Sequence, residues 1–288
     1  MTEPPGRSRP AGLGSPPQPA PPISIVGRGV TMSADSPDSR ERTATAPMPV
    51  PRRFDLEIVS VEDWTQTLRR IVLRAESLRQ LDYRPGQDLM LKLESGRDTV
   101  NRRYTIRRAD LGRGEVEIDV VRHGSGPGAR WAESARPGER LFDVVAPRGK
   151  ITIDRGVDWH LFIGDETAIP AMFHMAESLP DPRKVRVLLE VGWPVEAPPP
   201  PPGLDGAVHF VHRSGGPPGA DGPLLAAAAG APLPAGRGRA YIAGEARTVL
   251  AVRDLLQGRG LTRDQMAVKA YWRRDQPNLD RGEPDSAE

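Results

Sequence analysis

Hydrophobic and polar residues alternate in short runs between residues 54 and 145. Such alternation is typical of β-strands that bury one face. The runs predict six strands, at 54–59, 68–73, 89–93, 103–107, 116–121 and 141–145. Glycine and Pro-Gly pairs, which favour turns, separate several of them. Short strands at this spacing predict an antiparallel barrel that ends near residue 150.

The pattern changes after Trp159, where apolar runs become continuous and alternate with helical stretches. The runs predict buried strands at 159–163, 184–191, 207–211, 240–243 and 266–272, and helices at 168–179, 224–229 and 247–257. Strands that alternate with helices predict a doubly wound parallel sheet. The expected fold is therefore a β-barrel followed by an α/β half.

Both ends of the chain lack such patterns. Residues 1–49 consist mainly of Pro, Gly, Ser, Thr, Ala and Arg, and cannot bury enough apolar surface to offset the entropy of ordering. We expect a disordered tail there, or an upstream extension if translation starts at Met32 or Met48. The expected division is a tail at 1–49, a barrel domain at 50–153, an α/β domain at 154–276 and a tail at 277–288.

Composition excludes several kinds of chemistry. The chain has no cysteine, which excludes disulfides, thiolate metal sites, cysteine-ligated iron–sulfur clusters and a cysteine nucleophile. Lys and Arg total 40 and Asp and Glu total 38, so the net charge of +2 argues against nucleic acid as the main partner. The sequence has no apolar run long enough for a membrane helix and no signal-peptide core. We expect a cytoplasmic protein with no membrane partner.

The first candidate site lies on a predicted strand, in Asn101-Arg-Arg-Tyr-Thr-Ile-Arg. Side chains alternate along a strand, so Arg102 and Tyr104 share one face and Thr105 points away unless the strand twists. A guanidinium can make a forked contact with a pyrophosphate while the phenol ring lies against a flat heterocycle. The alternative is a charged outer strand with one half-buried tyrosine.

The second candidate is a glycine-rich stretch that begins with His123 and Gly124 and runs to Trp131. Its glycines let the backbone approach a ligand closely, and a helix that starts near Ala129 would direct free amides at a phosphate. The alternative is a flexible Gly-Pro connection with Trp131 anchored in the core.

Two further candidates lie at the ends of predicted parallel strands. The turn after the strand at 159–163 has two carboxylates and no Gly-x-Gly-x-x-Gly fingerprint, so we assign Thr167 to a nicotinamide or ribose and not to phosphate. Gly244, between Ala243 and Glu245, would allow close approach at a strand's carboxyl end. An ordinary capping turn at Thr167 remains open, as does an aromatic core plug at 271–274.

In this order, these motifs resemble those of the siderophore-interacting protein family of FAD-dependent ferric-siderophore reductases, in the ferredoxin-NADP reductase superfamily. The resemblance spans about residues 52–274. It implies FAD in the barrel, NADPH or NADH in the α/β half, and reduction of a ferric siderophore in the cytoplasm. It carries over Tyr104 and Thr105 as residues beside the reactive ring, Arg102, His123, Gly124 and Ala129 as further flavin contacts, and Thr167, Ala243, Gly244 and Glu245 as nicotinamide contacts.

Other basic and imidazole groups have less specific interpretations. Arg213 follows a predicted strand and could pair with a 2′-phosphate, which favours NADPH, or it is a surface arginine. Three arginines near the expected flavin edge could attract anionic iron chelates: Arg107, Arg122 and Arg130. His160 and His174 are expected to be structural, and no metal site is expected.

Two alternatives to an NAD(P)H-dependent reductase stay open. In the first, a reduced ferredoxin supplies electrons to the flavin. In the second, the chain is a non-catalytic binding protein that has lost FAD.

Overall fold

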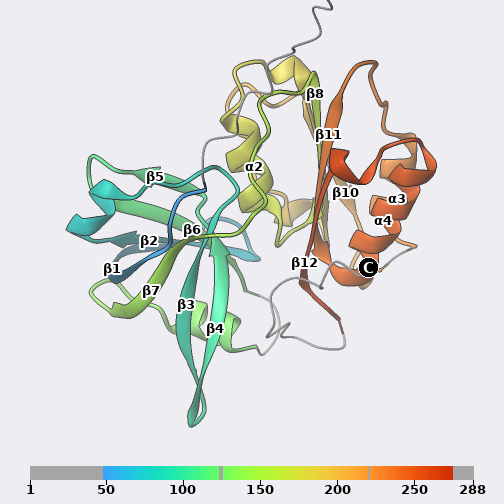
Figure 1. Ribbon diagram of the computed structural model, residues 1–288. Helices are drawn as coiled ribbons and strands as arrows, with labels where there is room; N and C mark the ends of the chain where they lie inside the picture. The colour runs from blue at the N-terminus through green and yellow to red at the C-terminus, as the bar shows by residue number, and fades with distance from the viewer. Residues whose placement is uncertain (1–47, 123–125, 220, 275–288) are drawn as a thin grey trace, which may run out of the picture. The chain divides into compact units, whose positions relative to one another are not determined.

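The computed structural model describes residues 48–122, 126–219 and 221–274, which form two sheets (Figure 1). The first sheet is antiparallel with strand order β4-β3-β7-β1-β2-β6-β5, and the second is parallel with order β10-β9-β8-β11-β12. We call the segments that carry them the antiparallel half (52–148) and the parallel half (159–272). The predicted combination of an antiparallel barrel-like sheet with an α/β half is confirmed. The proposed domain limits stay a prediction.

The antiparallel sheet is curled, with β4 and β5 at its two edges. Its strands are β1 (Arg52–Asp63), β2 (Leu68–Arg74), β3 (Asp88–Ser95), β4 (Asp98–Thr105), β5 (Arg108–Asp110), β6 (Glu115–Val121) and β7 (Arg140–Arg148). Helix α1 (Pro127–Ser134) precedes β7, and a 3-10 turn (Glu76–Gln80) follows β2. The sequence predicted every strand except β5, which is too short to show a period.

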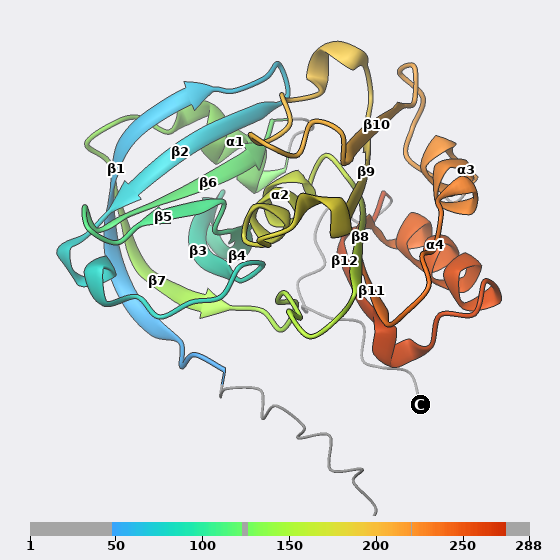
Figure 2. The ribbon, with the colours of Figure 1, turned by 90° about the horizontal axis from the view of Figure 1, so that it is seen from above.

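The parallel half alternates strands and helices as expected. It contains β8 (Trp159–Asp165), α2 (Ile169–Glu177), β9 (Val185–Val191), β10 (Val208–His212), α3 (Pro223–Gly230), β11 (Gly238–Glu245), α4 (Ala246–Gly258) and β12 (Met266–Trp272). Helix α2 covers one face of the sheet, and α3 and α4 cover the other (Figure 2). Since helices cover both faces, all seven residues of β8 are buried.

In each half, the pattern of buried and exposed residues agrees with the pattern that the sequence predicts. In β1, Phe54, Leu56 and Ile58 are buried and the residues between them are exposed, as expected for a sheet with one face on the core. In the parallel half, the rings of Phe162 and Tyr241 stack 4.8 Å apart, and the His160 ring stacks at 6.1 Å from each. No helix in the described ranges is long and apolar enough to cross a membrane.

Polar contacts join the end of β4 to helix α2. The Arg107 side chain is only 5% exposed and pairs with Glu177 of α2. Nδ1 of His174 donates to the carbonyl of Ile106, and Tyr83 Oη lies 3.4 Å from His174 Nε2. The expectation that Arg107 attracts chelates is therefore wrong, because its guanidinium is buried and already paired. His174 has the structural role that the sequence suggested.

Candidate functional site

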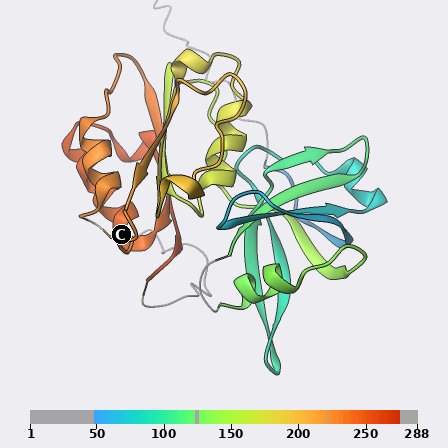
Figure 3. The same ribbon diagram turned by 180° about the vertical axis from the view of Figure 1, so that it is seen from behind.

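Strand β4 places Arg102 and Tyr104 against the first turn of α1. A Cβ atom added at Gly128 would lie 2.4 Å from the Tyr104 hydroxyl and 3.9 Å from Arg102 Cγ. Both side chains therefore face the helix, and a residue larger than glycine at position 128 would displace the phenol. Helix α1 lies beside the hairpin of β3 and β4 (Figure 3).

The start of α1 suits an anion. The helix begins at Pro127, two residues earlier than predicted, and its N-cap is Gly126. Within the described residues, no side chain caps this end and no acidic residue lies in the first turn. Uncapped amides carry the positive end of the helix dipole, and the Arg102 side chain, whose Cγ lies near this turn, adds a positive charge to this region. This donor set fits a phosphate or pyrophosphate.

An aromatic surface lies next to these donors. The ring of Tyr104 is 5.8 Å from that of Trp131 in α1, with the planes inclined by 36°. Burial raises the pKa of the Tyr104 hydroxyl above its usual range, so the phenol stays neutral. A neutral ring supported by a second aromatic residue offers a flat surface to a heterocycle. The residues present thus fit a flavin dinucleotide.

The other proposed flavin contacts do not all lie on the face that carries Arg102 and Tyr104. Thr105 is buried, and its side chain hydrogen-bonds with Tyr271 of β12, away from the face that carries Tyr104. Ala129 is buried in α1, directly after Gly128. His123 and Gly124 lie outside the described residues.

In the parallel half, Asp165 at the end of β8 binds groups from two other strands. One carboxylate oxygen accepts from the backbone N–H of Thr167 at 2.9 Å and from its hydroxyl. The other accepts from the N–H of Glu245 at 2.7 Å and from Trp272 Nε1 at 2.9 Å. Burial and the nearby Glu166 carboxylate raise the pKa of Asp165 to about 6. Asp165 therefore ties the carboxyl ends of β8, β11 and β12 together.

The predicted nicotinamide contacts lie together at this edge, where their own groups maintain the local structure. Gly244 has φ of +140°, and a Cβ there would lie 2.6 Å from the Asp165 carboxylate, so glycine is required. The Glu245 carboxylate caps α4 by accepting from the N–H groups of Arg247 at 2.7 Å and Thr248 at 3.0 Å. Ala243 is buried within β11.

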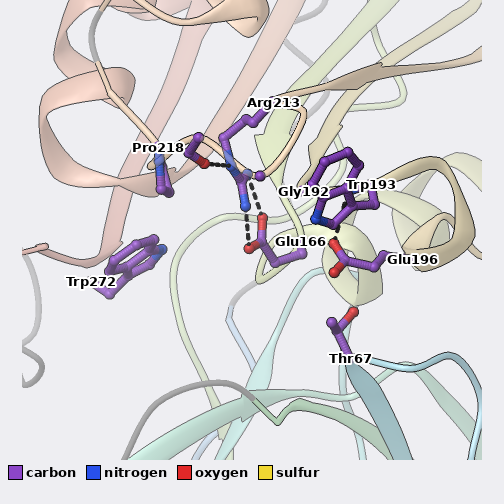
Figure 4. A pocket seen from close by; sticks show the side chains of 10 residues that line it. Thr67, Glu166, Gly192, Trp193, Glu196, Arg213, Pro218 and Trp272 are labelled. Carbon is purple, nitrogen blue, oxygen red and sulfur yellow. Dashed lines mark hydrogen bonds and ion pairs between the residues drawn. The ribbon is translucent and has the colours of Figure 1, made fainter.

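Arg213, after β10, is not a surface arginine, since its side chain is 8% exposed. It donates to both oxygens of Glu166 at 2.9 Å (Figure 4). It also donates to Glu190 at 3.1 Å. These partners could not be predicted from the sequence, because they lie 47 and 23 residues earlier.

A cavity of about 320 Å³ lies beside this ion pair. Its lining comes from loops after β8, β9 and β10, from the loop before β2, and from the end of β12: Thr67, Glu166, Gly192, Trp193, Glu196, Arg213, Gly215, Gly216, Pro218 and Trp272 (Figure 4). Trp193 was missed as a site residue. The available signal was a large aromatic residue directly after a buried parallel strand.

The remaining charged groups that the structure describes can be compared with the roles expected of them. Within the described residues, no cluster of three or more His, Asp or Glu side chains could hold a metal ion. Arg122 pairs with Asp63 and Glu133, at 2.8 Å each, so its charge is largely compensated and it does not fit the expected chelate-attracting role. Arg130 is exposed on α1.

Two family models match this chain. Residues 86–151 match the siderophore-interacting FAD-binding domain, and residues 157–275 match the siderophore-interacting protein model. The first match contains Arg102, Tyr104 and α1, and the second contains the cluster around Asp165.

Two known proteins are similar over most of the chain, and a third is similar over part of it. Ferric vibriobactin reductase ViuB of Vibrio cholerae is 31% identical over 206 residues, which are 70% of this chain and 73% of ViuB. The structure of a siderophore utilization protein from T. fusca superposes with a TM-score of 0.70 at 31% identity, covering 82% of this chain and 98% of that one. The NADPH-dependent ferric-chelate reductase of Escherichia coli is 34% identical over 79 residues, 27% of this chain and 30% of that protein. With a relative of this identity and coverage and both family models matched, the chain belongs to the siderophore-interacting protein family.

Proposed function

We propose that this protein is an FAD-dependent oxidoreductase that reduces the iron(III) of ferric siderophores with electrons from NADPH or NADH in the cytoplasm. The observation that carries the proposal is the placement of Arg102 and Tyr104 against the uncapped end of α1. The names of ViuB and of the E. coli relative support the reaction class.

In this proposal, the candidate residues of the antiparallel half hold the cofactor. Arg102 and the first amides of α1 bind the pyrophosphate, and Tyr104, backed by Trp131, lies against the flavin ring. We assign His123, Gly124 and Ala129 to further flavin contacts, as the resemblance implies. The resemblance also implies a flavin contact for Thr105, whose hydroxyl would have to exchange its hydrogen bond with Tyr271 for one with the flavin. When bound, FAD supplies a carrier that takes a hydride from the nicotinamide and passes two electrons singly to two ferric ions.

The carboxyl edge of the parallel sheet binds the nicotinamide nucleotide in this proposal. Thr167, Ala243, Gly244 and Glu245 line that edge, and Asp165 holds it in one geometry through its four hydrogen bonds. The iron needs no protein ligand, because hard oxygen donors bind iron(II) less tightly than iron(III) and reduction alone loosens the metal.

The test is anaerobic reduction of the FAD-loaded protein. We expect NADH or NADPH to bleach the flavin absorbance, and a ferric siderophore added afterwards to restore it while a chromogenic chelator traps iron(II). Flavin that neither nucleotide bleaches would refute the proposed donor. Reduced flavin that ignores several ferric siderophores would refute the proposed substrate.

A reduced ferredoxin is the second candidate donor. The observation that favours it is that the polar groups of Asp165, Thr167 and Arg213 already bind one another or neighbouring carboxylates. Prompt bleaching by reduced ferredoxin, with none by either nucleotide, would support this donor.

A further inference from the structure

The cavity beside Arg213 carries more negative than positive charge. Its lining contains the carboxylates of Glu166 and Glu196 and one guanidinium, that of Arg213. Behind Arg213, the fully buried carboxylate of Glu190 accepts from the guanidinium at 3.1 Å and from the N–H of Leu224 at 3.1 Å. The charge of Arg213 is thus shared between two acids before any ligand enters.

Arg213 cannot turn to a phosphate without a large penalty. Besides its bonds to Glu166 and Glu190, its Nε donates to the carbonyl of Gly216 at 3.2 Å. A phosphate that recruited this guanidinium would leave two buried carboxylates without their partner, and a buried charge that loses its partner is strongly destabilising.

The position of the cavity indicates which part of a dinucleotide it would meet. In α/β dinucleotide folds, an acid near the end of the second strand binds the 2′-hydroxyl of the adenosine ribose, whereas an arginine there accommodates a 2′-phosphate. Here β9 is the second strand of the parallel half, and it leads into Gly192 and Trp193, which line the cavity. The carboxylates of Glu166 and Glu196 can accept from a hydroxyl but repel a phosphate dianion.

Trp193 supplies an aromatic surface at the same place. Trp193 is 49% exposed, and Gly215 packs so closely beneath the indole that an added Cβ would lie 2.6 Å from the ring. The loop after β10 therefore supports one side of the indole, and a flat base can stack on an exposed aromatic ring of this kind.

We propose that the cavity between Trp193 and Trp272 binds the adenosine ribose and selects NADH over NADPH. This inference rests on the proposed function and replaces the sequence-based assignment of Arg213 to a 2′-phosphate. Two features produce this preference. The carboxylates accept a hydrogen bond from the 2′-hydroxyl, and the charge of Arg213 is already paired with Glu166 and Glu190.

Calorimetric titration of the FAD-loaded protein with NAD⁺ and NADP⁺ tests the proposal apart from catalysis. We expect NADP⁺ to bind at least about 10-fold more weakly, which corresponds to about 1.4 kcal/mol. Glu166→Gln should lower the NAD⁺ preference most, because it removes a charge and releases Arg213. Glu196→Gln, a milder change at the cavity edge, should lower the preference about 3-fold, since one repulsive charge is lost.

The matched control is Asp254→Asn, an exposed acid of α4 outside the cavity, which should leave the binding ratio unchanged. NADP⁺ that binds as tightly as NAD⁺, or a ratio that neither glutamate variant lowers, would overturn the inference. If NADPH then bleaches the flavin, the proposed function survives. If neither nucleotide binds or bleaches the flavin, both proposals fail together.

Discussion

The two halves of this protein use their polar motif residues in opposite ways. In the antiparallel half, Arg102 and Tyr104 lie beside a helix end that no described side chain caps. In the parallel half, Asp165 receives four hydrogen bonds, the Glu245 carboxylate caps α4, and Arg213 is paired with two acids. The motif residues of the antiparallel half are therefore placed where they could contact a ligand, whereas those of the parallel half hold one edge of the sheet together.

The same difference separates the proposed anion site from the proposed nucleotide-selecting site. The end of α1 offers donors and no first-turn acid, so it suits a pyrophosphate. The carboxyl edge of the parallel sheet is rich in carboxylates, and these already accept hydrogen bonds from other protein groups. A ligand at this edge could therefore contact the backbone, carboxylate oxygens that can accept further hydrogen bonds, and the indoles of Trp193 and Trp272. Four expected outcomes test this comparison.

The largest expected effect is on the antiparallel half. Replacing Arg102 and Tyr104 together by alanine should weaken FAD binding roughly 100-fold or more, equivalent to about 2.7 kcal/mol, because a charged pyrophosphate contact and a ring contact are both lost. Fluorescence titration with FAD measures it. Arg97→Ala, in the exposed turn between β3 and β4, is the control and should bind FAD normally. Equal affinity in the double variant would remove the basis for the flavin assignment.

In the parallel half, Asp165→Asn should affect stability. The asparagine amide would face donors that now meet a carboxylate, so the free energy of unfolding should fall by about 2 to 3 kcal/mol. Urea denaturation measures this loss, with Asp254→Asn as an exposed control that changes it by less than about 0.5 kcal/mol. A fully stable Asp165→Asn protein would contradict the role of Asp165 as the frame of this edge.

The ion pair between Arg107 and Glu177, which joins the two halves, should contribute somewhat less to stability. Arg107→Met removes one partner of a pair in which Arg107 is 5% and Glu177 23% exposed. We expect a loss of about 2 kcal/mol, less than for a fully buried pair because water reaches Glu177. Arg183→Met, which breaks a pair with an 89% exposed arginine, should leave the stability nearly unchanged. Equal losses in the two variants would argue against a buried pair at Arg107.

The last expected outcome is a pH dependence, which has almost no effect at neutral pH. Burial lowers the pKa of His160 to about 4, whereas an unfolded histidine titrates near 6.5, so its contribution to stability is lost as the pH falls through this window. His160→Phe keeps a ring in the stack but cannot be protonated. As the pH falls from 6.5 to 4, the stability of His160→Phe relative to the unchanged protein should rise by up to about 1.4 kcal/mol for each pH unit. Groups that titrate in both proteins cancel in this difference. Parallel pH profiles for the two proteins would refute the lowered pKa of His160.

The sequence predicted those features that depend on neighbouring residues. Alternation placed Arg102 and Tyr104 on one face of β4, and apolar runs located the parallel strands within a few residues. The fates of Arg107 and Arg213 were not predictable, because their partners are set by how distant elements pack. Glu177 is 70 residues from Arg107, and Glu166 meets Arg213 only because β8, β9 and β10 are neighbours in the sheet.

The central claim is that the face shared by β4 and α1 holds one flavin dinucleotide. The most direct measurement is the amount of FAD that stays with the purified chain after incubation with excess FAD and gel filtration, read from the visible spectrum. We predict one FAD per chain with a perturbed flavin spectrum. A chain that elutes colourless, with its fold intact by circular dichroism, would contradict the account.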